Sequence, residues 1–307
     1  MSATLPVSSN CGSTSNCLKD QLNSLGNSIL NDLDFKYYSD AEFNIIPALS
    51  SLTTELDISV FHINIRSLNK HYLELANFLS LLIIKFDIII LTEIWNCNLD
   101  LYSNLFDNCT FYYVEPDGSH VGGVGIYVKN DYSVTILDQY KISSNRKNIV
   151  DNLWLDVSNN SNRYIIAGIY RHPNQHILDF KNNIEPILSK IHDRGIPCII
   201  AGDFNIDLNK FNSHSPTTDY VNTLLLNKFL PIIIMPSRLA DSCATLIDHI
   251  YYFDGTICKH NYPVIGGNLW CNIYDHLPNF CLITKQISCT KSCNRPLVRI
   301  YSKKKYT

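Results

Sequence analysis

Short apolar runs, each about the length of a β-strand, recur along the chain after Asp57 and are separated by polar or helix-like stretches. These runs lie at residues 58–63, 86–91, 123–128, 153–157, 164–170, 197–201, 246–252 and 280–283. Amphipathic periodicity predicts helices over residues 72–84, 177–194 and 219–229. Many strands with few helices between them predict an α/β (α+β) fold in which two β-sheets pack face to face and helices flank them.

The chain of 307 residues is long enough for one large core, and its composition is that of a globular protein. Hydrophobic residues make up 46% and charged residues only 17%, which excludes a wholly disordered or coiled-coil chain. Residues 1–55 are rich in Ser, Asn, Thr and Leu and predict a loosely ordered polar leader. The strand pattern places a domain at 56–285, followed at 286–307 by a basic tail that we expect to be solvated rather than phosphate-binding.

A formal net charge of −3 argues against a protein that binds nucleic acid non-specifically, because such binding neutralises many phosphates with Lys and Arg. It does not argue against a nuclease, which can grip phosphate through a metal ion held by carboxylates. The 11 cysteines lack the paired spacing of zinc sites, with Cys289 and Cys293 the nearest approach, so we expect reduced thiols. The sequence has no secretory signal and no apolar stretch of bilayer length, so we expect an intracellular protein of the nucleus or cytoplasm with no membrane partner.

Polar residues lie at or near the ends of several of the predicted strands. They are Asn64, Glu93, Tyr170, Asp203, Asn205, Asp248, Asp275 and His276. A rigid sheet holds side chains at the carboxyl ends of its strands beside a crevice, so these residues are candidates for one shared site. Taken singly, each has an ordinary interpretation: Gly202–Asn205 as a turn, Glu93 as a helix-start charge and His276 as a histidine satisfied within the fold.

The order and spacing of the whole set resemble those of the endonuclease/exonuclease/phosphatase superfamily, which has the deoxyribonuclease I-like fold. The motif GDFN at 202–205 is followed about 70 residues later by the DH pair at 275–276. Six segments are similar to the endonuclease domain of LINE-type, non-LTR retrotransposons: HINIRSLNKH (62–71), IIILTEIW (88–95), GGVGIYVKN (122–130), GIYRHPN (168–174), AGDFNIDL (201–208) and TLIDHIY (245–251). The resemblance spans about residues 56–285 and implies a four-layered α/β-sandwich of two packed mixed sheets flanked by helices.

In such elements this domain is joined to a reverse transcriptase, for which the present chain has no room. We therefore expect a stand-alone fragment or a domesticated copy, acting as a monomer. The resemblance also implies a bound Mg²⁺, for which Mn²⁺ would substitute. Glu93 matches the family's metal-binding Glu, Asn64 would lie beside it, and Asp275 would act in the metal's shell.

The resemblance further assigns roles in phosphodiester cleavage. Asp203 matches the Asp that orients or deprotonates the attacking water, and Asn205 would donate to a phosphate oxygen. His276 matches the histidine that faces the scissile phosphate, and Asp248 would hold its ring in place. Tyr170 would contact the phosphate.

Two arginines lie next to these positions, and Arg pairs bidentately with phosphate. We therefore interpret Arg66 and Arg171 as contacts to the DNA backbone. The chain departs from the family pattern before the DH pair, where Tyr274 replaces the usual Ser and would crowd the site or stack on a substrate.

Three functional hypotheses follow from the sequence. The first is a Mg²⁺-dependent endonuclease that nicks DNA to leave 3′-hydroxyl and 5′-phosphate ends. The second keeps the fold but changes the substrate, as in RNA exonucleases or inositol phosphatases. The third is a catalytically degenerate, retroelement-derived binding protein, favoured by Tyr274 and by the near-neutral charge.

Overall fold

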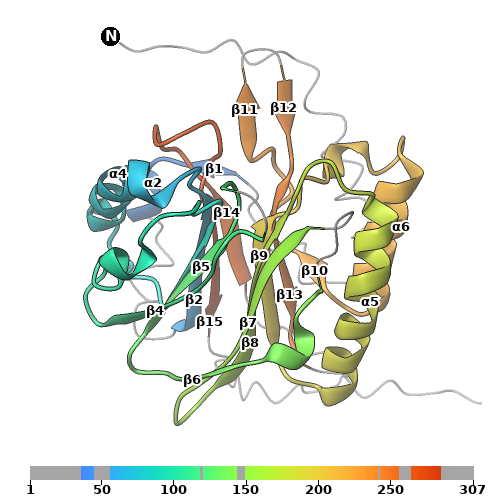
Figure 1. The fold of residues 1–307 in the computed structure, drawn as a ribbon, viewed down its shortest axis with the longest axis horizontal. Helices are drawn as coiled ribbons and strands as arrows, with labels where there is room; N and C mark the ends of the chain where they lie inside the picture. The colour runs from blue at the N-terminus through green and yellow to red at the C-terminus, as the bar shows by residue number, and fades with distance from the viewer. Residues whose placement is uncertain are drawn as a thin grey trace, which may run out of the picture.

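Two large mixed β-sheets pack face to face in the computed structural model, which describes residues 36–44, 56–117, 120–143, 149–240, 243–255 and 264–284. Helices lie on the outer side of each sheet, so that the molecule has four layers (Figure 1). This architecture confirms the predicted α/β-sandwich.

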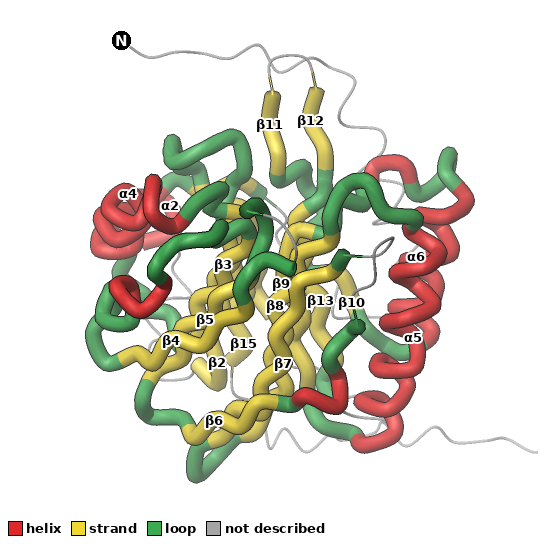
Figure 2. The backbone as a smooth tube through the Cα atoms, viewed as in Figure 1, coloured by secondary structure: helices red, strands yellow, loops and turns green. Residues whose placement is uncertain are grey.

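The first sheet contains, in spatial order, β1 (Tyr37–Tyr38), β14 (Val264–Leu269), β15 (Asn279–Thr284), β2 (Leu56–Asn64), β3 (Ile88–Thr92), β5 (Val124–Lys129) and β4 (Cys109–Val114). The second sheet contains β10 (Leu230–Pro231), β13 (Asp248–Phe253), β9 (Cys198–Asp203), β8 (Arg163–Arg171), β7 (Val150–Ser158) and β6 (Ser133–Ile136). Helices α2 (Asp40–Asn44) and α4 (Leu68–Leu81) flank the first sheet, and α5 (Ile177–Arg194) and α6 (Ser215–Leu226) flank the second. Short 3₁₀ helices lie at Leu99–Tyr102, Asp138–Tyr140 and Leu208–Lys210. Figure 2 shows the strands gathered between the two groups of helices.

The central strands are apolar on both faces because each face is covered. In β3, Ile88 and Ile90 belong to the core between the sheets, whereas Ile89 and Leu91 belong to the core beneath α4. Successive side chains of a strand point to opposite faces, which explains why this run reads as continuously apolar. None of the described helices combines the length and the apolar character needed to cross a membrane.

Part of the segment expected to be a loosely ordered leader belongs to the domain. Strand β1 pairs in parallel with β14 at the edge of the first sheet. Phe43 of α2 is fully buried, with its ring centroid 4.9 Å from that of Phe280. The prediction of a loosely ordered leader relied on the average polar composition of residues 1–55 and overlooked these few aromatic residues. Residues 1–35, 45–55 and the predicted tail at 286–307, with Cys289 and Cys293, lie outside the described residues.

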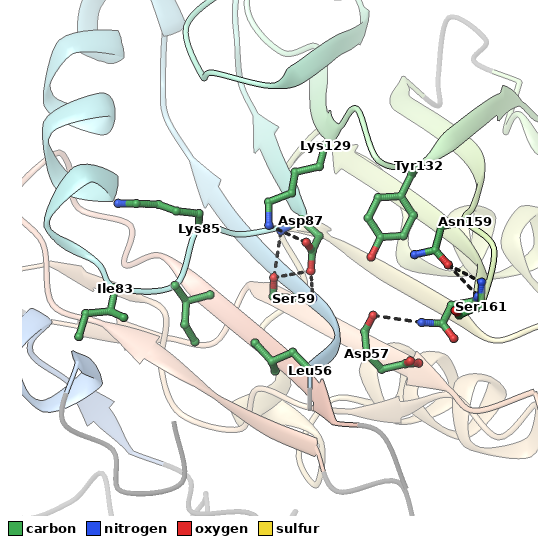
Figure 3. A pocket seen from close by; sticks show the side chains of 12 residues that line it. Leu56, Asp57, Ser59, Ile83, Lys85, Asp87, Lys129, Tyr132, Asn159 and Ser161 are labelled. Atoms are coloured by element: carbon green, nitrogen blue, oxygen red, sulfur yellow. Dashed lines mark hydrogen bonds and ion pairs between the residues drawn. The ribbon is translucent and has the colours of Figure 1, made fainter. Parts of the chain in front are cut away.

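Two features mark the opposite ends of the sandwich. A two-stranded hairpin of β11 (Arg238–Ala240) and β12 (Cys243–Thr245) projects from one end (Figure 1). At the end where β2 begins, a cavity of about 360 Å³ contains Asp87, which accepts a hydrogen bond from Ser59 Oγ at 2.7 Å and pairs with Lys129 Nζ at 2.7 Å (Figure 3). This network ties the start of β3 to β2 and β5.

Candidate active site

The sheet topology brings the carboxyl ends of β2, β3, β8 and β9 together with the start of β13. Asn64 ends β2 and lies in register with Thr92, the last residue of the parallel strand β3, so that Glu93 follows beside it. In the second sheet, Tyr170 of β8 is in register with Asp203 of the parallel strand β9. Asp203 in turn faces Asp248, the first residue of the antiparallel strand β13. Residues far apart in the sequence therefore meet at one end of the sandwich.

The Asn64 side chain connects the two sheets at this end. Its Nδ2 atom donates to Glu93 Oε1 at 2.9 Å and to Asp203 Oδ2 at 2.7 Å. Asn64 and Asp203 are each 1% exposed. An amide can donate two hydrogen bonds through its NH₂ group, and here both go to carboxylates. The first sheet thus supplies Glu93 and the second supplies Asp203 to one polar centre.

A second cluster joins Asp203 to an aspartate–histidine pair. The ligand atoms of Asp203, Asp248 and His276 all lie within 4.8 Å of one another. His276 Nδ1 lies 2.8 Å from Asp248 Oδ2. Among the described His, Cys, Asp and Glu side chains, no other three form such a group, so Glu93 and Asp275 fall outside it.

Burial and neighbouring charges perturb the pKa values in this cluster. Burial, followed by the charge of Asp248, raises the pKa of Asp203 to about 7, although His276 and hydrogen bonds from Asn205 and Asn64 act in the opposite direction. Burial alone would lower the pKa of His276, but the charge and hydrogen bond of Asp248 and the charge of Asp203 raise it to about 9. The cluster therefore holds an imidazole that is protonated near neutral pH beside a carboxylate that titrates there.

Ser237, which the sequence analysis did not identify, supports the aspartate–histidine pair. It is fully buried, and its Oγ donates to Asp248 Oδ2 at 2.7 Å while accepting from the Asp248 backbone N–H at 2.9 Å. Its backbone carbonyl accepts a hydrogen bond from Leu277 N at 2.7 Å. Ser237 follows no predicted strand, so the sequence gives no signal for it.

Two aromatic side chains surround Glu93. Tyr170 is 3% exposed, and its pKa is raised mainly by burial and then by the charge of Glu93, with which it also shares a hydrogen bond. Trp95 Nε1 donates to Glu93 Oε2 at 3.1 Å. Trp95 is a further residue that the sequence analysis did not single out. Both oxygens of Glu93 are thus engaged by side-chain donors.

Asp275 lies beside the centre but faces the hairpin. Its Oδ2 accepts a hydrogen bond from Arg238 Nε at 2.8 Å, and its backbone carbonyl accepts one from Leu239 N at 3.0 Å. The Asp275 Oδ1 atom is buried with no hydrogen-bond partner among the described residues. The expected place of Asp275 in a metal shell stays a prediction.

Arg171 is buried, so it is not available for the predicted contact with a DNA backbone. The side chain is 1% exposed and donates to the backbone carbonyls of Gln175 at 2.8 Å, Asn205 at 2.7 Å and Phe204 at 2.5 Å. Burial lowers its pKa to about 10. Successive side chains of a strand point to opposite faces. Because Tyr170 points between the sheets, Arg171 points to the other face of its sheet. Arg171 instead holds the loop that follows β9.

Asn205 takes part in the same arrangement. Its Nδ2 donates to the Arg171 backbone carbonyl at 2.8 Å, and its backbone N–H donates to Asp203 Oδ1 at 2.9 Å. A second N–H of the amide remains available for a substrate oxygen. Asn205 also has a positive φ of 48°. Such backbone conformations cost free energy and cluster at functional sites.

Arg66 is exposed at the mouth of the site. Its guanidinium carbon lies 4.5 Å from the centroid of the Tyr274 ring. The side chain that replaces the usual Ser therefore lies beneath a cation, which is a stabilising arrangement. Of the two predicted backbone-contacting arginines, Arg66 alone is accessible to solvent.

The donor set suits a hard divalent cation. The centre offers carboxylate oxygens from Glu93 and Asp203, and Asn64 turns its Nδ2 toward both of them. The Asn64 Oδ1 atom accepts a hydrogen bond from the Arg66 backbone N–H at 3.1 Å. Asp248 Oδ1 is buried and has no hydrogen-bond partner among the described residues, so it has an unused lone pair. Oxygen donors of this type are those that Mg²⁺ and Ca²⁺ prefer.

Comparisons with known proteins identify the fold and the family. A comparison with curated protein sequences gave no significant match. The fold is similar to that of the endonuclease domain of TRAS1, a telomere-specific non-LTR retrotransposon, with a TM-score of 0.56 and 14% identity over 74% of this chain and 98% of that one. An AP endonuclease from Archaeoglobus fulgidus gives a TM-score of 0.56 and 13% identity over 74% of this chain and 99% of that one.

A third solved structure, of TDP2 from D. rerio complexed with a single-strand DNA product, has a TM-score of 0.54 and 12% identity over 74% of this chain and 99% of that one. Identities this low show a shared fold. The model of the endonuclease/exonuclease/phosphatase family matches residues 61–267, which include Asn64, Glu93, Asp203 and Asp248. Members of that family are hydrolytic phosphoesterases that generally use divalent metals. By this match and by its fold, the chain belongs to the endonuclease/exonuclease/phosphatase family.

Proposed function

We propose that this protein is a Mg²⁺-dependent DNA endonuclease of retrotransposon origin that nicks DNA to leave 3′-hydroxyl and 5′-phosphate ends. The observation that carries the proposal is the buried cluster of Asp203, Asp248 and His276, whose ligand atoms lie within 4.8 Å of one another. A carboxylate and a carboxylate-held imidazole at this separation can act on one phosphate group.

Glu93 would hold the metal, with Asn64 beside it and Asp275 close by. When bound, Mg²⁺ supplies positive charge that stabilises the pentavalent phosphorus of the transition state. The remaining tasks belong to side chains of the protein.

Asp203 acts as the general base that orients and deprotonates the attacking water. The backbone N–H of Asn205 at 2.9 Å and Asn64 Nδ2 at 2.7 Å fix its two oxygens. With its pKa raised to about 7 by burial and the charge of Asp248, Asp203 is a stronger base than an ordinary aspartate. A base whose pKa lies near the working pH is the most effective one.

His276 stabilises the negative charge that develops on the phosphate. Asp248 keeps the ring oriented through the 2.8 Å contact with Nδ1, which leaves Nε2 as the donor toward the substrate. The hydroxyl of Tyr170 and the second amide N–H of Asn205 provide further donors. Removing one such donor typically costs about 10²–10³-fold in kcat.

Three considerations favour DNA over other phosphoesters. The segments HINIRSLNKH and GIYRHPN resemble those of the retrotransposon endonucleases. The TRAS1 domain and the A. fulgidus enzyme are named as endonucleases, and TDP2 is seen with a DNA product. Arg66 presents an exposed cation at the mouth of the site, where it can pair with a flanking phosphate. The proposal includes an intracellular location and a monomeric state.

The test compares substrates. The protein is incubated with supercoiled plasmid, with an inositol polyphosphate and with an RNA oligonucleotide, each in Mg²⁺ and in EDTA, with Asp203→Ala as control. We expect nicked plasmid in Mg²⁺ alone, sealed by DNA ligase because a 3′-hydroxyl and a 5′-phosphate are present. Release of inorganic phosphate from the inositol compound, or shortening of RNA with intact plasmid, would place the protein in another branch. No metal-dependent reaction on any substrate would support the degenerate binding protein instead.

A further inference from the structure

The indole of Trp95 holds one oxygen of Glu93. Trp95 Nε1 donates to Oε2 at 3.1 Å, while Asn64 Nδ2 donates to Oε1 at 2.9 Å. A carboxylate that accepts a fixed donor on each oxygen cannot rotate about its terminal torsion without losing one of them. These two donors, with the Tyr170 hydroxyl that also hydrogen-bonds to Glu93, therefore define the plane in which the remaining lone pairs of Glu93 lie.

Trp95 is itself fixed by the backbone. The backbone N–H of Trp95 donates to the carbonyl of Gly122 at 2.9 Å, and the backbone N–H of the next residue, Asn96, donates to the carbonyl of His120 at 3.1 Å. Glu93 and Trp95 have positive φ values of 54° and 60°. For residues with a side chain, this backbone conformation costs free energy. The loop nevertheless keeps this unfavourable backbone conformation, in which the Glu93 and Trp95 side chains are hydrogen-bonded to each other.

Positioning of this kind matters more for one metal than for another. Mg²⁺ demands near-ideal octahedral geometry at short distances, whereas Ca²⁺ accepts variable coordination. Partners of a metal-ligating side chain commonly change metal affinity by about 10–100-fold when they are removed.

We propose that Trp95 is a positioning residue that sets the orientation of the Glu93 carboxylate and thereby favours Mg²⁺ over Ca²⁺. The inference rests on the proposed metal site and adds to it a residue that selects the ion. A purely structural role, in which the indole only fills space, is the alternative. Trp95→Phe separates the two, because it keeps an aromatic ring and removes the N–H donor.

Trp270 provides a matched control. It is 44% exposed and packs on Tyr37, with ring centroids 5.1 Å apart, at the β1 edge of the first sheet. Calorimetric titration of the whole protein with Mg²⁺ and with Ca²⁺ should show Mg²⁺ affinity weakened by about 10–100-fold in Trp95→Phe. Ca²⁺ affinity should change less, and Trp270→Phe should match the wild type for both ions.

A second measurement uses the unaltered protein, in case Trp95→Phe fails to fold. The chain has three tryptophans, so ¹⁵N labelling gives three indole N–H signals in an NMR spectrum. Trp270→Phe identifies one signal. Trp154 lies in the core, where its Nε1 donates to Asn152 Oδ1 at 3.1 Å, whereas Trp95 donates to the proposed metal ligand Glu93. Bound Mn²⁺ should therefore broaden the Trp95 signal more than the Trp154 signal, which tells the two apart. The Trp95 signal should shift on addition of Mg²⁺ and the other two should not.

The outcomes are distinguishable. If the wild type binds no Mg²⁺, the proposed function fails. If the wild type binds Mg²⁺ but Trp95→Phe binds both ions with unchanged affinities, or the Trp95 indole signal stays in place, the positioning role is overturned and the proposed function stands.

Discussion

Asp203 and Asp248 lie directly opposite each other on the antiparallel strands β9 and β13, and both carboxylates are buried. Their nearest carboxylate oxygens lie within 4.8 Å of each other, so the two groups cannot both be ionised without a compensating positive charge. His276 supplies most of that compensation through its contact with Asp248. Burial raises the pKa of Asp248, but the charge and hydrogen bond of His276, together with His62 and Ser237, lower that pKa below its ordinary value. Burial, and then the negative charge on Asp248, raise the pKa of Asp203.

The first prediction concerns pH. Asp203 must be ionised to act as a base, so kcat/KM should rise as pH increases through its pKa of about 7. His276 must be protonated to stabilise negative charge, so kcat/KM should fall as pH increases through its pKa of about 9. A bell-shaped profile with its maximum between these values is expected from initial nicking rates. A profile that is flat from pH 6 to pH 10 would contradict both assignments.

The second prediction concerns the origin of the histidine's pKa. Asp248→Asn removes the negative charge that holds the proton on His276, so the pKa of that imidazole should drop below about 9 and approach or pass its ordinary value. NMR titration of the ring protons measures this directly. The descending limb of the pH profile should move to lower pH, and kcat should fall by about 10²–10⁴-fold. An unchanged His276 titration would show that Asp248 does not control the ring.

The third prediction separates a structural arginine from a functional one. Arg171→Ala removes a buried guanidinium and leaves three carbonyl acceptors without their donor. The free energy of unfolding should decrease by about 3–5 kcal/mol, measured by urea denaturation. Arg171→Lys should recover only part of the loss, because an ammonium cannot reproduce the fork of the guanidinium. A variant as stable as the wild type would contradict this role.

The fourth prediction concerns Arg66, which lies exposed over Tyr274. Arg66→Ala should decrease the unfolding free energy by only about 0.5–1 kcal/mol, because the variant loses an exposed cation–π contact. Binding to a DNA duplex, measured by fluorescence anisotropy, should weaken, and the slope of log K against log salt should decrease by about 1. An unchanged salt slope would show that Arg66 touches no phosphate.

The central strands of the fold were predictable because burial on both faces gives continuous apolar runs, as in β2, β3, β8 and β9. Strand β14, with sequence VIGGNL, was not predicted because its two glycines argue against a strand. A Cβ at Gly267 would lie 2.7 Å from the Tyr38 ring, so the glycine is needed where β1 packs alongside. That contact arises from residues more than 200 positions apart, which no local pattern reports.

The ends of the strands located the candidate site, but the direction of each side chain was harder to foresee. Tyr170 and Arg171 are adjacent in sequence, yet Tyr170 contacts Glu93, whereas Arg171 is buried against the loop that follows β9. Ser237 and Trp95 reach the site from loops that follow no simple periodicity. The pairing of Asp275 with Arg238 depends on where the hairpin lies, which the sequence alone does not specify.

The central claim is that Asp203 acts in a divalent-metal-dependent hydrolytic centre. The rate of supercoiled-plasmid nicking by the wild type and by Asp203→Asn, at pH 8 with Mg²⁺ or EDTA, tests it most directly. We predict nicked circles from the wild type in Mg²⁺, none in EDTA, and a rate at least about 100-fold lower for the variant. Equal rates for the two proteins, or nicking that persists in EDTA, would contradict the claim.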